Sequence, residues 1–137
     1  MTSELNLDYA EARRAIDTIV AEVARRGKAA VVVVADSRGE LIALARMDGA
    51  SLASITIAAN KAFTAARAGK PSFDVGAKVR HPELGFDIAY YGDPRFCGWG
   101  GGVPVKKDGK IVGAVAVSGL PQEEDMEVVL LGASAIY

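Results

Sequence analysis

The stretch GGGVPVKKDGKIVGAVAVSG, residues 100–119, decides the fold of this chain. Asp108-Gly109 separates two β-branched, apolar runs, residues 103–107 and 110–117, and Asp-Gly between such runs is the strongest short-range hairpin signal. Pro104 has no N–H to donate to a sheet, so its strand lies at an edge or begins there. The stretch therefore predicts a β-hairpin with a glycine-rich entry and a Ser118-Gly119 exit.

A second hairpin comes earlier in the chain, where Ala29–Ala35 and Glu40–Arg46 flank a turn over residues 36–39. Apolar residues at helical spacing and end signals predict helices around the two hairpins. They cover Asp8 to Gly27, with Asp8 and Glu11 as a capping box, Ser51–Ala66, Ser72–Arg80 and a last segment opened by Glu123, Glu124 and Asp125. Because hairpins join antiparallel strands, this order predicts an α+β fold with helices packed on an antiparallel sheet.

The composition limits the classes of partner. The 137 residues fit one domain, 1–137, and the net charge of −1 with no basic run argues against nucleic acid and anionic membranes as partners. Cys97 is the only cysteine, which excludes an internal disulfide and favours a reducing, cytoplasmic location. The N-terminus has no signal-peptide pattern, and no apolar run is long enough to span a bilayer.

The predicted helix Ser51–Ala66 is apolar or small on nearly all sides, which is typical of a helix that is covered all round. One side of this helix is expected to pack on the sheet. In so small a domain, the simplest candidate to cover its other side is another subunit or a ligand. Lys61 is the only charged residue between Ala50 and Ala66. Its ammonium group must find a partner or shift its pKa, so it forms an ion pair, binds a ligand carboxylate or acts as a base.

Other candidate residues lie in the connections. Arg46 and Asp48 end a strand, where they either pair with each other or orient a polar ligand. The glycines 100–102 expose backbone N–H groups, as happens beside a ligand or another backbone. Their context fits neither a dinucleotide fingerprint nor a phosphate loop.

The loop from Arg80 to Gly100 holds the single histidine, His81, and an aromatic group in which Trp99 forms a wall with Tyr90 and Tyr91. One histidine and one cysteine cannot make a structural zinc site, so no metal site is predicted. A Ser/His/Asp triad stays open, although no G-x-S-x-G elbow marks a serine. The residues of types that can ligate haem iron are His81, Tyr90, Tyr91, Met47 and Cys97.

Four motifs occur in a fixed order: RMDGA at 46–50, KAFTA at 61–65, GGVP at 101–104, and GAVAVSG at 113–119, followed by Asp125. Taken together, and over almost the whole chain from Leu7, they resemble the GlcG/HbpS-like family, often labelled haem-degrading domain, which includes the C-terminal domain of PduO proteins. Two departures stand out: the segment between Arg80 and Gly100 is distinctive, and Ala116 stands where the family often has glycine.

The resemblance implies a two-layer, profilin-like α+β fold with a five-stranded antiparallel sheet and homo-oligomeric assembly. Some members bind haem or related tetrapyrroles, and others lie in catabolic operons. No axial haem ligand can be carried over. The positions that match the family, and that are expected to line a common pocket, are Arg46, Asp48, Lys61, Gly101, Gly102, Pro104, Ser118, Gly119 and Asp125.

Two functional hypotheses follow. In the first, the chain binds haem or another flat anionic small molecule, with its acid groups at Arg46 or Lys61 and its ring on apolar strand residues and Trp99; Tyr90 is a further ligand-binding candidate. In the second, it is an enzyme without a cofactor that acts on a small carboxylated or aromatic metabolite, with Lys61, Asp48 or His81 moving protons and glycine N–H groups holding an oxyanion. A third hypothesis is an oligomeric scaffold with a vestigial pocket.

Overall fold

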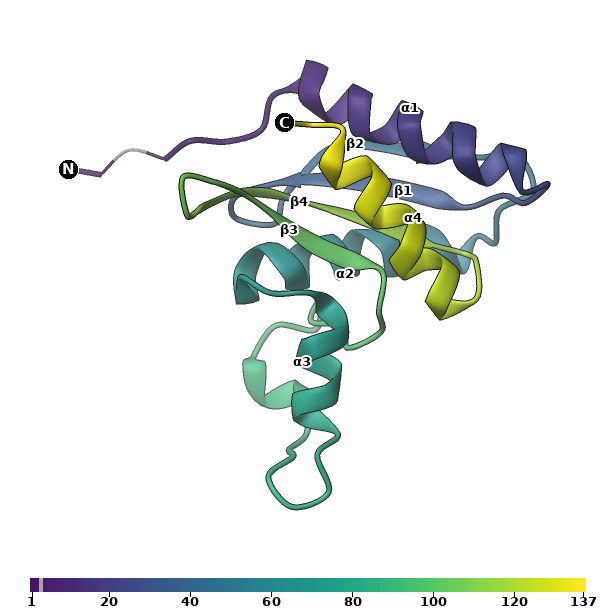
Figure 1. The fold of residues 1–137 in the computed structure, drawn as a ribbon. Coiled ribbons are helices and arrows are strands. Elements are labelled where there is room, and N and C mark those ends of the chain that lie inside the picture. The colour runs from purple at the N-terminus through teal and green to yellow at the C-terminus, as the bar shows by residue number, and fades with distance from the viewer. Residues whose placement is uncertain (3) are drawn as a thin grey trace.

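A computed structural model describes residues 1–2 and 4–137, and it places one antiparallel sheet at the centre of the chain (Figure 1). The strands are β1 (Val31–Asp36), β2 (Leu41–Arg46), β3 (Gly102–Lys107) and β4 (Lys110–Ser118). Their order across the sheet is β2-β1-β4-β3. The two hairpins therefore meet along β1 and β4, which pair Val31 with Ser118 and Asp36 with Gly113.

The helices lie on both faces of this sheet. In Figure 1, α1 (Tyr9–Arg25) lies above the sheet and α2 (Ala53–Ala68) lies below it, whereas α4 (Gln122–Ser134) crosses in front of the strands. The short α3 (Ser72–Val79) and the 3₁₀ helix η1 (Ile88–Tyr91) project further below, away from the strands. Among the described helices, none has the length and apolar character needed to cross a membrane.

The predicted hairpins are confirmed. Asp108 and Gly109 have φ angles of 52° and 77°, and positive φ at both positions is the geometry of the type I′ turn that Asp-Gly favours. Pro104 lies on β3, which pairs with β4 alone and is an edge strand of the described sheet. The capping box is also present, with Asp8 and Glu11 each accepting the other's backbone N–H.

The α+β class is confirmed, but the prediction of five strands is wrong, because the described sheet has four. The two hairpins account for all four strands. Between α2 and the second hairpin the chain forms α3, η1 and loops, and Pro82, Pro94 and several glycines interrupt it. Proline cannot donate to a sheet, and glycine weakens a strand, so this segment is a poor source of another strand.

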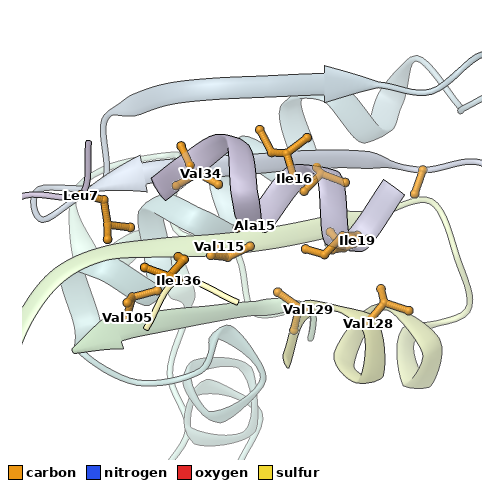
Figure 2. Packing of buried hydrophobic residues seen from close by; sticks show 14 of the residues in the cluster. Leu7, Ala15, Ile16, Ile19, Val34, Val105, Val115, Val128, Val129 and Ile136 are labelled. Carbon is orange, nitrogen blue, oxygen red and sulfur yellow. The ribbon is translucent and has the colours of Figure 1, made fainter. Parts of the chain in front are cut away.

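The main core lies between the sheet and the layer of α1 and α4 (Figure 2). Ile16 and Ile19 of α1 and Val128 and Val129 of α4 meet the strand residues that point to the same face. Those strand residues are Val32, Val34, Val105, Val112, Val115 and Val117. Branched side chains fit this pleated surface well, which explains why valine dominates the strands.

The opposite face of the sheet carries α2 through small side chains. Ala58, Ala62 and Ala65 meet Val31, Val33, Ala35, Ala114 and Ala116, all of them buried. Such short side chains let a helix approach a sheet closely. The second cover of α2 comes in part from the chain's own loop, because Phe96 packs edge-on against buried Phe63 with ring centroids 5.2 Å apart.

Candidate functional site

An open cleft of about 490 Å³ lies where β4 ends and the chain turns into α4. This volume is in the range of roughly 300–1,000 Å³ that is usual for small-molecule sites. Segments far apart in the sequence form its walls: α2, residues 99–100 and the connection from β4 to α4. We call it the Lys61 cleft, and its lining residues are Ser54, Lys61, Trp99, Gly100, Ser118, Gly119, Leu120, Gln122 and Asp125.

A buried ion pair forms the floor of the cleft. Lys61 Nζ donates to Asp125 Oδ2 at 3.2 Å and to the backbone oxygen of Val117 at 2.9 Å. The exposed fractions of the Lys61 and Asp125 residues are 2% and 3%. Of the alternatives for Lys61, the structure therefore shows the ion pair within the subunit, and it places that pair at a ligand-sized cleft.

The carboxyl group of Asp125 has a raised pKa. Burial raises the pKa of its carboxyl group from the ordinary 3.8 to about 6. The positive charge of Lys61 and the N–H of Leu120, which donates to Asp125 Oδ1 at 3.2 Å, lower the pKa but do not offset the burial. Asp125 is thus ionised at neutral pH and becomes neutral in mildly acidic solution.

The glycines beside the cleft are required by backbone packing. Gly101 has a φ of 123°, and a Cβ there would lie 2.9 Å from Lys61 Nζ and 2.7 Å from the Val117 oxygen. A Cβ on Gly102 would lie 2.5 Å from the backbone oxygen of Lys61. The sequence left two alternatives for these glycines, close contact with a ligand or with another backbone. The structure shows contact with another backbone, and this lets β3 approach α2.

Two hydrogen bonds hold the wall that carries Trp99 and Gly100. The Ser72 hydroxyl donates to the Trp99 backbone oxygen at 2.7 Å, and the Gly100 N–H donates to Gln122 Oε1 at 2.9 Å. The indole itself remains 58% exposed. The result is a flat aromatic surface beside the cleft, fixed at its backbone.

Five predicted site residues line the Lys61 cleft together: Lys61, Trp99, Ser118, Gly119 and Asp125. Gly101 and Gly102 lie next to it and line a separate apolar pocket of about 170 Å³ against α4. Pro104 lies two residues further along the edge strand.

Arg46 and Asp48 lie elsewhere, in a hollow that they share with Val20, Ala45 and Met47. Among the described residues, Arg46 and Asp48 form no ion pair with each other. Val31 pairs with both Arg46 and Ser118, so these two residues lie at the same end of the sheet, two strands apart. The structure therefore brings Arg46 near the cleft's end of the sheet without making it a lining residue.

His81 and Tyr90 also lie outside the cleft. His81 is exposed after α3, and its Nδ1 accepts the N–H groups of Glu83 and Leu84 at 3.1 and 3.0 Å. Tyr90 is 83% exposed on η1, whereas its neighbour Tyr91 stacks on Phe96 with centroids 4.5 Å apart. In the described parts of the chain, no three His, Cys, Asp or Glu side chains gather as a metal site requires.

Sequence reasoning missed the cleft roles of Ser54, Leu120 and Gln122. Ser54 had a signal, because it lies on the same weakly polar side of the helix as Lys61. No sequence signal marked Leu120 and Gln122 as lining residues. They flank Pro121, which precedes α4, and residues beside such a proline usually have only a structural role in the turn.

Two sequence comparisons match most of the chain to known proteins. The sequence model of the family described as "Haem degrading protein HbpS-like" matches residues 7–134. A 15.0 kDa protein from the dhaT-dhaS intergenic region of Citrobacter freundii is 30% identical over 119 residues, which cover 87% of this chain and 84% of that protein.

Two solved structures share the fold. The Klebsiella pneumoniae protein ORFY superposes with a TM-score of 0.93 at 24% identity, over 99% of this chain and 94% of that one. The PduOC protein, in a complex with haem, superposes with a TM-score of 0.88 at 22% identity, over 96% and 95% of the two chains.

Proposed function

Because the chain belongs to the HbpS-like family of haem-degrading proteins, we propose that it is a single ligand-binding domain whose Lys61 cleft binds haem or another flat anionic ring compound. The observation that carries the proposal is the exposed indole of Trp99 beside a cleft with a buried ion pair in its floor. The structure of PduOC, a protein of the same fold, holds haem, which supports the choice of ligand.

The residues of the cleft fit the ring of a haem but not its iron. Trp99 and Leu120 offer apolar surface, and the hydroxyls of Ser54 and Ser118 are hydrogen-bond donors for acid groups at a ring edge. The cleft lining contains no His, Cys, Met or Tyr that could ligate iron. The proposed binding therefore rests on the ring and its acid groups.

Trp99→Ala is expected to weaken haem binding by about tenfold or more, because stacking of a ring on an aromatic side chain contributes about 1–3 kcal/mol. The measurement is a spectral titration of the Soret band, which should saturate at one haem per chain in the unmodified protein. Tyr9→Ala, an exposed aromatic on α1, is the matched control and should leave the affinity unchanged.

Iron-free protoporphyrin IX provides the second arm of this titration. It is expected to bind about as tightly as haem, since the cleft offers no iron ligand. Absorption that never saturates, or a Trp99→Ala variant that binds haem as tightly as the unmodified protein, would contradict the proposal.

A second candidate function, acid–base catalysis without a cofactor, is favoured by one observation: a carboxylate with a pKa of about 6 beside an ammonium group at a cleft. Asp125 would take a proton from the carbon next to a substrate carbonyl, and Lys61 would donate a hydrogen bond to the enolate oxygen. Asp48 and His81 are outside the cleft, so this proposal assigns the proton transfer to the buried pair.

Deuterium exchange tests this candidate. The unmodified protein is expected to speed the exchange of the methyl protons of pyruvate in D₂O, followed by proton NMR. The Lys61→Met/Asp125→Asn double variant, which removes both charges together, should lose this activity. Exchange no faster than in buffer alone would count against catalysis of this kind.

Homo-oligomeric assembly belongs to the same proposal. Leu130 and Leu131 on α4 are 57% and 45% exposed, and Leu52 before α2 is 71% exposed. Leu130 and Leu131 are neighbours on α4, and we propose that they form part of a contact with another copy of the chain.

A further inference from the structure

A second hollow, of about 420 Å³, is also lined by Trp99 and lies between α2, the end of α3 and the loop that returns to β3. Three aromatic residues line it, Phe86, Phe96 and Trp99, together with the polar residues Asn60, Arg80 and Cys97. We call it the Arg80 hollow. It contains none of the buried ion pair that forms the floor of the Lys61 cleft.

The walls of the Arg80 hollow are fixed by buried contacts. The hydroxyl of Thr64, a fully buried residue, accepts the Cys97 N–H at 2.8 Å, and Ser72, also fully buried, holds the Trp99 backbone. The backbones of Gly76 and Gly98 touch, because a Cβ on Gly76 would lie 1.8 Å from the Gly98 oxygen. A site with walls fixed in this way loses little conformational entropy when a ligand enters.

Arg80 brings an available positive charge to this hollow. Among the described residues, its side chain makes one hydrogen bond, from Nη1 to the Gly98 backbone oxygen at 3.3 Å. It takes part in none of the ion pairs that the described residues form. The guanidinium group presents several N–H donors in one plane, so most of its hydrogen-bonding capacity is left for a ligand.

We propose that the Arg80 hollow is a second ligand site, which binds a small planar aromatic carboxylate with its ring against Phe86, Phe96 and Trp99 and its carboxylate on Arg80. A single cation matches a single carboxylate, and a planar guanidinium matches the two carboxylate oxygens. The aromatic walls favour a flat ring over a saturated one, because rings gain from stacked or edge-to-face contact. This site does not depend on haem binding in the Lys61 cleft.

Cys97 supplies the measurement, because it is the only cysteine of the chain and it lines the hollow. Its alkylation by iodoacetamide, an uncharged reagent that Arg80 does not attract, is followed by mass spectrometry with and without benzoate. Saturating benzoate is expected to slow the alkylation by about fivefold or more. Benzamide, which has the ring without the charge, and cyclohexanecarboxylate, which has the charge without the flat ring, should protect much less.

Arg80→Ala is expected to raise the benzoate concentration that gives half-maximal protection by about tenfold or more, as for the loss of a hydrogen bond to a charged group. Arg13→Ala, an exposed arginine on α1, is the matched control and should protect as the unmodified protein does. Arg80 is exposed, so its removal should leave the thermal midpoint unchanged, which is measured alongside.

Three outcomes would overturn the proposal: no protection by benzoate, equal protection by benzamide, or unchanged protection in Arg80→Ala. None of them bears on haem binding, which is measured without benzoate. Conversely, a failed haem titration leaves the alkylation result intact, so the two proposals fail separately.

Discussion

Lys61→Met is expected to lower the free energy of unfolding by about 3–5 kcal/mol at pH 8, the usual cost of leaving one member of a buried ion pair without its partner. Asp125 is 3% exposed and would keep only the N–H of Leu120 as a hydrogen-bond donor. The measurement is urea denaturation followed by circular dichroism, with the slope of the transition checked for constancy.

The loss should be smaller at pH 5 than at pH 8. In the folded protein the pKa of Asp125 is about 6, above its ordinary value of 3.8, and removal of Lys61 raises it further. Below pH 3.8, the carboxyl group of Asp125 is protonated in both the folded and the unfolded states, so its burial does not lower the free energy of unfolding. As the pH rises through the interval between the two pKa values, the folded state loses stability.

The double variant Lys61→Met/Asp125→Asn is the matched control. Its amide oxygen can still accept the Leu120 N–H, and no charge remains to be buried, so most of the lost stability should return. A single variant as stable as the unmodified protein at both pH values would show that Asp125 carries no charge in the folded state.

Gly76→Ala is expected to destabilise the protein by about 3 kcal/mol or more and to reshape the Arg80 hollow. The added Cβ would lie 1.8 Å from the Gly98 backbone oxygen and 2.7 Å from Arg80 Nη1. The side chain of Arg80 can move aside, but the Gly98 backbone can move only if the loop that carries Cys97 and Trp99 leaves α3. The change is measured as a drop in thermal midpoint together with faster alkylation of Cys97.

Helix propensity alone predicts the opposite sign, since alanine is favoured over glycine inside a helix by about 1 kcal/mol. Ala77→Gly, one residue later and exposed in the same helix, therefore measures the propensity effect by itself. It should cost about 1 kcal/mol and leave Cys97 alkylation unchanged. A Gly76→Ala variant that is more stable than the unmodified protein would show that the two backbones are not packed together.

Local signals were enough to predict most elements of the fold. The Asp8–Glu11 capping box, the Asp108-Gly109 turn and the short helix from Ser72 each depend on residues close together in the sequence, and the structure confirms them. The five-stranded sheet, in contrast, came from the family resemblance rather than from these residues. No local pattern between Arg80 and Gly100 indicates a strand. In the structure this segment forms η1 and loops.

The site was harder to predict because its contacts are long-range. Lys61 stood out as a lone charge in an apolar helix, yet its partner Asp125 lies 64 positions away, in an acidic helix start with three carboxylates to choose from. The sequence placed Arg46 and Asp48 close to Lys61 along the chain. The register of β1 instead puts Arg46 on the far side of that strand from Ser118, and both residues line a different hollow.

Trp99 is a lining residue of both the Lys61 cleft and the Arg80 hollow. A molecule that fixes its indole ring in one orientation does so for both sites at once. If a ligand in one site changes the affinity of the other site by some factor, the second ligand changes the affinity of the first site by the same factor. Any coupling between the two sites would therefore pass through Trp99, and a haem titration repeated with and without benzoate measures its size.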